Sequence, residues 1–245
     1  DHGGLFGAIE FYDTCKAHGI HPIIGFEAYI SSGSRTEKSV ETNTKSNHLI
    51  LLAKNDCGFR NLMRLSSIGY TEGFYYKPRI DMEILSQYSE GLIAATACIA
   101  GAVPEAFIKG DDKKARQIAE EYLKIFGEGN LYFELQNHGI DEEEIAFKGM
   151  IELGKEMGIP FIVTNDAHYL NKEDAKAHEI LLCMQTQDTL ANPDHYRFST
   201  DEIYFKSPDE MCALFPELPE AIKNTFEIAK RCEVNVHHKP QLPVP

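Results

Sequence analysis

The sequence predicts an α/β fold in which short buried strands alternate with amphipathic helices. Runs rich in β-branched and aromatic residues recur along the chain, and the segments between them place apolar residues at the i, i+3, i+4, i+7 spacing of a helix. Strand followed by helix, repeated, is typical of parallel β/α architecture. The chain has 245 residues, 43% hydrophobic and 25% charged, which suits an ordinary soluble globular protein with a sizeable core.

The apolar runs define the predicted strands, in the order 22–30, 48–54, 91–98, 131–137 and 160–166. Helical patterns lie between them, at 5–12, 59–66 and 115–126. A further helix is expected over 141–157. Its first turn, "DEEE", places negative charge at the partly positive helix N-terminus, and Gly158 is a suitable terminator.

The character of the chain changes from about Ser199. "SPDE" at 207–210 is a capping box that predicts a helix start, and a second helix is expected over 219–232. The final "HHKPQLPVP" favours an extended, stiff exit. We therefore expect a barrel domain over residues 1–198 and, over 199–245, a helical extension with a proline-rich linker.

Residues able to bind metal lie at or near the ends of the predicted strands. Glu27 lies inside the first strand, His48 begins the second, Cys98 ends the third, His138 follows the fourth, and Asp166 and His168 close the fifth. At the carboxyl ends of barrel strands such side chains converge on one cleft, and each can offer a lone pair to a divalent cation. His48 precedes its strand, so either that strand runs the other way or His48 reaches in from a loop.

Charge and cysteine content exclude some classes of protein. The net charge of −14 argues against broad capture of nucleic acid by basic side chains, although metal ions held by carboxylates and imidazoles can still bind phosphate. Six cysteines without a C-x-x-C pair argue against a zinc ribbon and a disulfide framework. Without an apolar run long enough for a membrane span, or a signal sequence, a cytoplasmic location in bacteria and no membrane partner are expected.

Several segments together resemble the polymerase and histidinol phosphatase (PHP) domain. They are "DHGG" at 1–4, "GFEAY" at 25–29, "NHLILLAKN" at 47–55, "TACIAG" at 96–101 and "TNDAHYL" at 164–170. With "GFYYKPRID" at 73–81 and "ELQNHGI" at 134–140, the sequence more narrowly resembles the PHP domains of bacterial DNA polymerase III alpha subunits. The resemblance covers nearly the whole chain.

The resemblance implies a distorted seven-stranded β/α (TIM-like) barrel that holds two or three divalent metal ions, which can be zinc, manganese, magnesium or iron. Its metal ligands carry over to His2, Glu27, His48, Cys98, Asp166 and His168. The family begins with an H-x-H strand upstream of the "DHG" segment, whereas this chain begins at Asp1. We therefore expect a truncated barrel that lacks its first strand and the ligands on it.

The chemistry implied by the resemblance is metal-dependent phosphoester hydrolysis, with Asp166, His168 and Glu27 as catalytic residues. On the 3′ end of a DNA primer this reaction is a 3′–5′ exonuclease that proofreads beside a polymerase. The expected partners are then DNA, a polymerase core in the same chain and other replisome subunits. Such a chain is a fragment of a DNA-directed DNA polymerase, a nucleotidyltransferase. No polymerase carboxylate triad is evident, so nucleotide addition is expected beyond Pro245.

Other interpretations stay open at this stage. The domain can be an inactive scaffold stabilised by its metals, or a free-standing phosphatase on a small phosphomonoester. His138 can orient a metal ligand or be a surface residue. Arg79 and Lys77 can contact a phosphate or lie in a solvated turn, and the D-x-H pair taken alone also suits a strand end that meets water.

Overall fold

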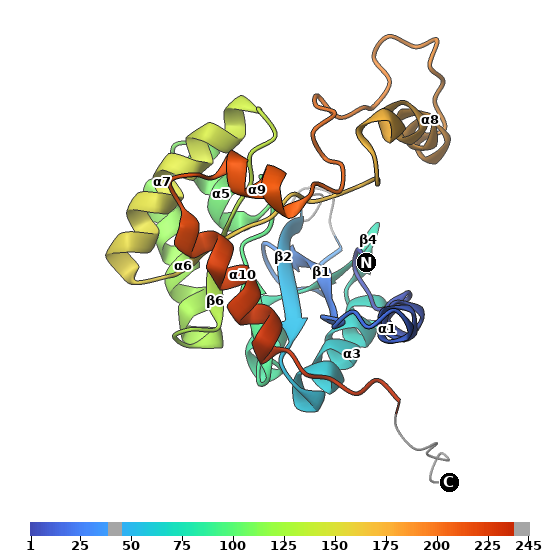
Figure 1. The fold of residues 1–245 in the computed structure, drawn as a ribbon. Helices are drawn as coiled ribbons and strands as arrows, with labels where there is room; N and C mark the ends of the chain where they lie inside the picture. The colour runs from blue at the N-terminus through green and yellow to red at the C-terminus, as the bar shows by residue number, and fades with distance from the viewer. Residues whose placement is uncertain (39–45, 238–245) are drawn as a thin grey trace, which may run out of the picture.

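The computed structural model describes residues 1–38 and 46–237 and builds them on one sheet (Figure 1). The strands lie side by side in the order β3-β4-β1-β2-β5-β6-β7. In chain order they are β1 (Gly25–Ser31), β2 (Ser46–Ala53), β3 (Phe74–Tyr75), β4 (Lys77–Ile80), β5 (Leu92–Ala95), β6 (Leu131–Leu135) and β7 (Phe161–Val163). The expected α/β class is confirmed. Within the described ranges no pairing joins β7 to β3, so the closed seven-stranded barrel is not observed.

Strand direction follows the parallel expectation except at two strands. β4 runs parallel to β1, and β5, β6 and β7 run parallel to one another. β2 is antiparallel to both of its neighbours, β1 and β5, and β3 is antiparallel to β4. The parallel β/α prediction therefore fails at β2, the strand for which the sequence leaves a reversed direction open because His48 precedes its apolar run. The sequence between β1 and β2 is polar and lacks the apolar period of the crossover helix that a parallel connection needs.

All predicted strands are present, and each is similar in length to the prediction or shorter. The missed strands, β3 and β4, lie within the "GFYYKPRID" segment that was weighed as a turn. They are short, and Pro78 cannot donate a backbone hydrogen bond, so the segment lacks the long alternating pattern that identifies a strand.

Helices cover the sheet largely where the sequence places them. They are α1 (Ala8–Ala17), α3 (Asp56–Thr71), α4 (Met82–Gln87), α5 (Ala102–Ile108), α6 (Asp112–Phe126), α7 (Asp141–Met157), a 3-10 turn η1 (Lys172–Asp174), α8 (Ala175–Thr186), α9 (Pro208–Leu214) and α10 (Pro219–Arg231). α7 matches its predicted bounds, with Gly158 left-handed at its end, and the capping box of Ser207 and Glu210 is present. α4, α5 and α8 were not predicted.

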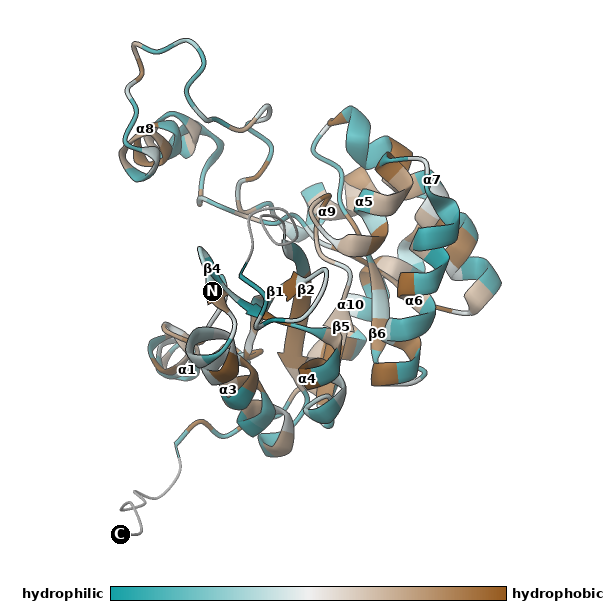
Figure 2. Cartoon of the chain, turned by 180° about the vertical axis from the view of Figure 1, so that it is seen from behind, coloured by the Kyte–Doolittle hydropathy of each residue, from teal (hydrophilic) through white to brown (hydrophobic). Residues whose placement is uncertain are grey.

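The central strands are buried on both faces. Along β5, Leu92 and Ala94 belong to the main apolar core, which also contains residues of α3, α6 and α7. Ile93, on the opposite face of β5, packs in a second cluster with Ile228 of α10. Figure 2 shows β2, between these layers, hydrophobic over the part of its length that follows its polar first residues. Burial on both sides explains why these strands read as continuous apolar runs.

The C-terminal segment is attached to the sheet through α10. Its last residue, Arg231, donates hydrogen bonds to the Gly129 carbonyl, the Tyr132 hydroxyl and the Asn130 side chain. α8 and the segment after it project away from the sheet instead (Figure 1). The division at residue 198 stays a prediction, and the end of the expected linker, 238–245, lies outside the described residues.

None of the helices in the described ranges combines the length and the apolar content that crossing a lipid bilayer requires.

Candidate metal centre

The reversed direction of β2 brings His48 to the candidate site. Because β2 is antiparallel to β1 and β5, its first residues lie at the edge where those strands end. Glu27 pairs with Ile50 and Tyr29 pairs with His48, so Glu27 and His48 are diagonal neighbours on one face of the hairpin. Of the two alternatives weighed for His48, the reversed strand is the one observed.

Glu27, His48 and Cys98 form the centre of the site. One donor atom from each side chain lies within 4.8 Å of the other two. The Nδ1 atom of His48 is 3.1 Å from Oε1 of Glu27 and 3.6 Å from Sγ of Cys98. Three elements that are distant in the sequence therefore aim a carboxylate, an imidazole and a thiol at one point.

His2 joins this centre through the backbone of its own segment. Glu27 donates its backbone N–H to the Asp1 carbonyl at 3.0 Å, and Gly3 donates to the Glu27 carbonyl at 2.8 Å. These two bonds hold His2 beside Glu27 in the manner of a short parallel strand. Nδ1 of His2 lies 3.4 Å from Oε1 of Glu27. Gly3 has φ of +70° and packs against Pro78, so a side chain there would be both strained and obstructed.

Asp166 and His168 border the site from the end of β7. The Nδ1 atom of His168 is 2.6 Å from the backbone carbonyl of Asp166, which can only accept, so Nδ1 carries the proton. In the neutral ring Nε2 then keeps its lone pair for a metal. The ring of His168 lies 6.2 Å from that of His2. Asp166 has φ of +43°, a left-handed conformation that Asp tolerates better than most residues.

The electrostatics of the site suppress charge on its donors. Burial, then the charges of Asp166 and Glu134, raise the pKa of Glu27 to about 7. Burial and the charge of His2 lower the pKa of His48 to about 4. Burial and the charge of Asp166 raise the pKa of the Cys98 thiol to about 12. A group of donors that repel one another in this way is the environment that a cation would neutralise.

The donor set fits a divalent cation. Oε1 of Glu27 is buried and accepts no hydrogen bond within the described part of the chain, although two imidazole nitrogens lie close to it. A buried carboxylate oxygen without a donor is costly unless another group, such as a metal, satisfies it. Nitrogen, sulfur and oxygen donors together suit zinc, and imidazole also suits iron, while carboxylates admit manganese or magnesium.

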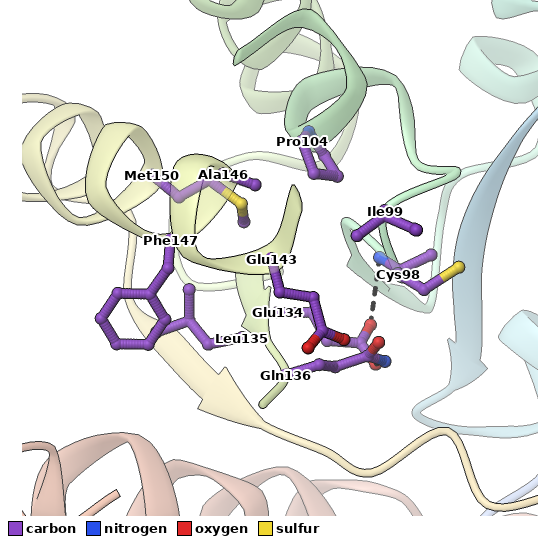
Figure 3. A pocket seen from close by; sticks show the side chains of 11 residues that line it. Cys98, Ile99, Pro104, Glu134, Leu135, Gln136, Glu143, Ala146, Phe147 and Met150 are labelled. Carbon is purple, nitrogen blue, oxygen red and sulfur yellow. Dashed lines mark hydrogen bonds between the residues drawn. The ribbon is translucent and has the colours of Figure 1, made fainter. Parts of the chain in front are cut away.

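Glu134 is a buried carboxylate at the site that the sequence reasoning missed. It accepts a hydrogen bond from the Ala97 amide at 3.1 Å and from the Thr164 hydroxyl at 2.6 Å. It therefore connects the residue before Cys98 with Thr164, the first residue after β7. Figure 3 shows Glu134 in the small pocket beside Cys98. Its position within the apolar "LYFELQN" run is a signal that could have found it, because a carboxylate inside a buried strand needs a partner.

His138 is buried, so it is not the surface residue of one interpretation, and its ring is bonded beside the end of β7. Its Nδ1 lies 2.5 Å from the Glu143 carboxylate and its Nε2 lies 2.9 Å from the Asn165 carbonyl. An ionised carboxylate and a carbonyl are both acceptors, so this arrangement favours a proton on each ring nitrogen and a cationic ring. Burial works to lower the pKa of His138, but the bond to Glu143 and its charge outweigh burial and the net shift is upward. The bond from His138 thus fixes the backbone of Asn165, the residue before Asp166.

The expectation that Arg79 contacts a phosphate is not supported. Its side chain is 1% exposed, because its guanidinium is used inside the protein, where it donates to the carbonyls of Gly73, Arg35 and Glu37. Lys77, two residues earlier, is exposed and lies over the ring of Tyr29. After burial and the neighbouring carboxylates, the ammonium of Lys77 is among the charges that act on the pKa of Glu27. Of the two basic residues in the β3–β4 hairpin, Lys77 is therefore the one whose charge reaches the site.

The raised pKa values of Glu27 and Cys98 predict that metal binding releases protons, and that it releases more of them at pH 6 than at pH 8. Glu27, with a pKa of about 7, holds a proton at pH 6 that a metal must displace, whereas at pH 8 it has already lost it. The thiol of Cys98 loses a proton on binding at both pH values. Calorimetric zinc titrations in buffers of different ionisation enthalpy measure the proton count. The same release at both pH values would contradict the prediction, and Glu27→Gln should reduce the difference.

Comparison with known proteins decides the family. The sequence model of the PHP domain matches residues 1–138, more than half of the chain. The chain belongs to the PHP domain family. Curated relatives of this PHP domain include the DNA polymerase III subunit alpha of Treponema pallidum, 46% identical over 100% of the chain, and that of Thermus aquaticus, 42% identical over 100% of it. The protein of the same name from Borreliella burgdorferi is 45% identical over 95% of the chain.

The PHP domain chain spans about a fifth of the length of these relatives, 20% to 21% of each. The family resemblance inferred from "DHGG", "GFEAY" and the D-x-H segment is thereby confirmed. Glu27, His48 and Cys98, which the resemblance names as ligands, are the residues that the structure brings closest together.

Proposed function

We propose that this PHP domain belongs to a bacterial replicative DNA polymerase alpha subunit and hydrolyses phosphodiester bonds at the 3′ end of a DNA primer. Support comes from relatives that are all named DNA polymerase III subunit alpha and align with at least 95% of the chain. The observation that carries the hydrolytic part is the buried, unpartnered Oε1 of Glu27, surrounded by imidazole and thiol donors. Such a group has the composition of a catalytic metal centre.

The proposed ligands are His2, Glu27, His48, Cys98, Asp166 and His168. They would hold two or three divalent ions, with zinc, manganese, magnesium and iron as the candidates. When bound, the ions would supply Lewis-acid stabilisation of a phosphate group and activation of water.

The protein groups around the ions would position the substrate and prepare the ligands. Asp166 and Glu27 contribute negative charge, while His168 offers Nε2 because the Asp166 carbonyl holds Nδ1–H. Lys77 is exposed and its charge acts on Glu27, so its ammonium would bind a phosphate oxygen. His138 holds the backbone of Asn165 and, through it, the position of Asp166.

The proposal includes the surroundings of the domain. The row of strands, with the carboxyl ends of β1, β5 and β7 at the site, would form part of a TIM-like barrel. Residues 1–198 would form the barrel domain, and 199–245 would lead toward a polymerase core in the same chain. Nucleotide addition would belong to that core, and DNA and other replisome subunits would be the partners.

Removal of metal tests the hydrolytic function. The protein is treated with a chelator, reloaded with manganese and assayed on a primer labelled at its 3′ end, with bound metal measured per chain. We expect release of the labelled nucleotide only from the reloaded protein, and restoration of the activity in proportion to the bound metal.

A scaffold role is the alternative that the same experiment separates. The candidate ligands come from the N-terminal segment, β1, β2, the residues after β5 and the end of β7, so a metal would cross-link distant parts of the fold. Tight metal content, a lower melting temperature after chelation and no release of label under any condition would support the scaffold and reject the exonuclease.

A further inference from the structure

A group of aromatic side chains lies directly beside the proposed metal centre. The ring of Phe198 is 4.9 Å from that of His168 and 5.5 Å from that of His178 on α8. Tyr196 continues the group, with its ring 6.1 Å from Phe198. We call Tyr196, Phe198 and His178 the aromatic platform. His168 contacts both the platform and His2, so the platform begins where the candidate ligands end.

The platform borders a cleft large enough for a nucleotide. The cleft has a volume of about 710 Å³ and is lined by Phe198 and His178, with Lys176 and Arg197 among its polar residues. Pockets for small ligands occupy roughly 300–1,000 Å³ and combine apolar walls with a few polar groups. The cleft is also lined by Tyr169, whose hydroxyl is buried and has no hydrogen-bond partner within the described residues.

The chemistry of the platform suits a nucleobase better than a phosphate chain. Tyr196 is 56% exposed and half-buried Phe198 adjoins it, so flat apolar surface faces the solvent. Lys176 and Arg197 are balanced by Glu179, Asp201 and Glu202 in the same wall, so the cleft has no excess of positive charge for several phosphates. Aromatic side chains alternating with a cation, as in "YRF" at 196–198, are typical of surfaces that stack single-stranded bases.

We propose that the aromatic platform stacks the terminal base of a single-stranded DNA 3′ end, while the adjoining phosphodiester reaches the metal centre. This inference rests on the proposed function. Tyr196 and Phe198 supply the stacking surface, and His168 lies between the stacked base and the metal. Stacking tolerates any base, as a nuclease acting on all four nucleotides requires. The platform would favour an unpaired end, because a paired base cannot leave its partner without cost.

Binding of a fluorescent DNA end tests the platform. The probe is a single-stranded oligonucleotide that ends in 2-aminopurine and has a non-hydrolysable phosphonate as its last linkage. It is titrated into the intact protein in parallel with a probe whose terminal nucleotide is abasic. We expect quenching of the terminal base on binding and about 5- to 100-fold tighter binding than for the abasic probe. Tyr196→Leu and Phe198→Leu should each reduce both effects.

The control variant is Phe226→Leu, which changes an exposed aromatic residue on α10. This variant should retain the full quenching of 2-aminopurine and the full preference for the probe with a terminal base over the abasic probe. Equal binding of the two probes by the unchanged protein, or quenching that survives both platform substitutions, would overturn the proposal. Tyr196 is exposed, so Tyr196→Leu keeps the test valid even if Phe198→Leu fails to fold. The probe cannot be cleaved, so an absence of exonuclease activity leaves this measurement readable.

Discussion

Asp166→Asn is expected to reduce manganese-dependent release of a 3′-terminal nucleotide by on the order of 100-fold or more, while the protein stays folded. The substitution keeps the shape of the side chain and removes its negative charge. That charge acts on most of the site, since it shifts the pKa of Glu27 and Cys98 upward after burial does. An amide is also a much weaker metal ligand than a carboxylate, so metal content should fall together with activity.

Asparagine is the right replacement because of the backbone at this position. Asp166 has φ of +43°, and Asn is the other common residue that accepts the left-handed region. Alanine there would add strain and confuse loss of charge with loss of structure. Without metal, Asp166→Asn should be at least as stable as the unchanged protein, because a charge that repels Glu27 is removed.

The control for this prediction is Asp209→Asn in the first turn of α9, an exposed carboxylate outside the site. It should change neither metal content nor nucleotide release. Full activity of Asp166→Asn, measured in the 3′-label assay with equal bound metal, would remove Asp166 from the proposed chemistry.

Glu143→Gln is expected to lower the free energy of unfolding by about 3 kcal/mol, the range for breaking a buried ion pair from one side. Glu143 accepts hydrogen bonds from both the backbone N–H and the ring Nδ1 of His138, and both side chains are nearly fully buried. With glutamine the imidazolium loses its counter-charge. His138 is then expected to lose its charge, and its bonds to residue 143 and to the Asn165 carbonyl become ordinary neutral hydrogen bonds, which are weaker, so the end of β7 is held less firmly.

The neighbouring residue supplies a matched control. Glu144 lies in the same turn of α7 but is exposed and pairs with Lys148, so Glu144→Gln should leave the free energy of unfolding close to that of the unchanged protein. Chemical denaturation of both variants gives the comparison. We also expect weaker zinc binding only in Glu143→Gln, because Asn165 and Asp166 are displaced there. Similar stability of the two variants would show that the His138–Glu143 pair is not important for the fold.

The strands and their polar ends were predictable because burial on both faces leaves long apolar runs. The runs at 91–98 and 131–137 identified β5 and β6, and the residues that interrupt or follow such runs gave most of the candidate site. The direction of β2 was less accessible, because an apolar run has the same period read either way. The position of His48, before its run and not after it, raised the possibility of a reversed strand.

The residues that support the site were harder to predict than its donors. Glu134 and Glu143 appear in the sequence as one more acidic residue in a strand and in a helix start, and only the tertiary structure shows that each is buried with a partner. Arg79 shows the reverse error. A basic residue in a "KPR" segment suggested a phosphate contact, whereas three backbone carbonyls supplied by residues up to 44 positions away bury it.

The β1–β2 hairpin also bears on the order of events during folding. Glu27 and His48 sit diagonally on one antiparallel pair, so a carboxylate and an imidazole meet as soon as a local hairpin closes, at a small entropic cost. Cys98 and Asp166 must arrive from much more distant parts of the chain. A nascent chain would therefore hold two of the six proposed ligands side by side before the rest of the sheet exists, and an ion captured early would help to recruit the later strands.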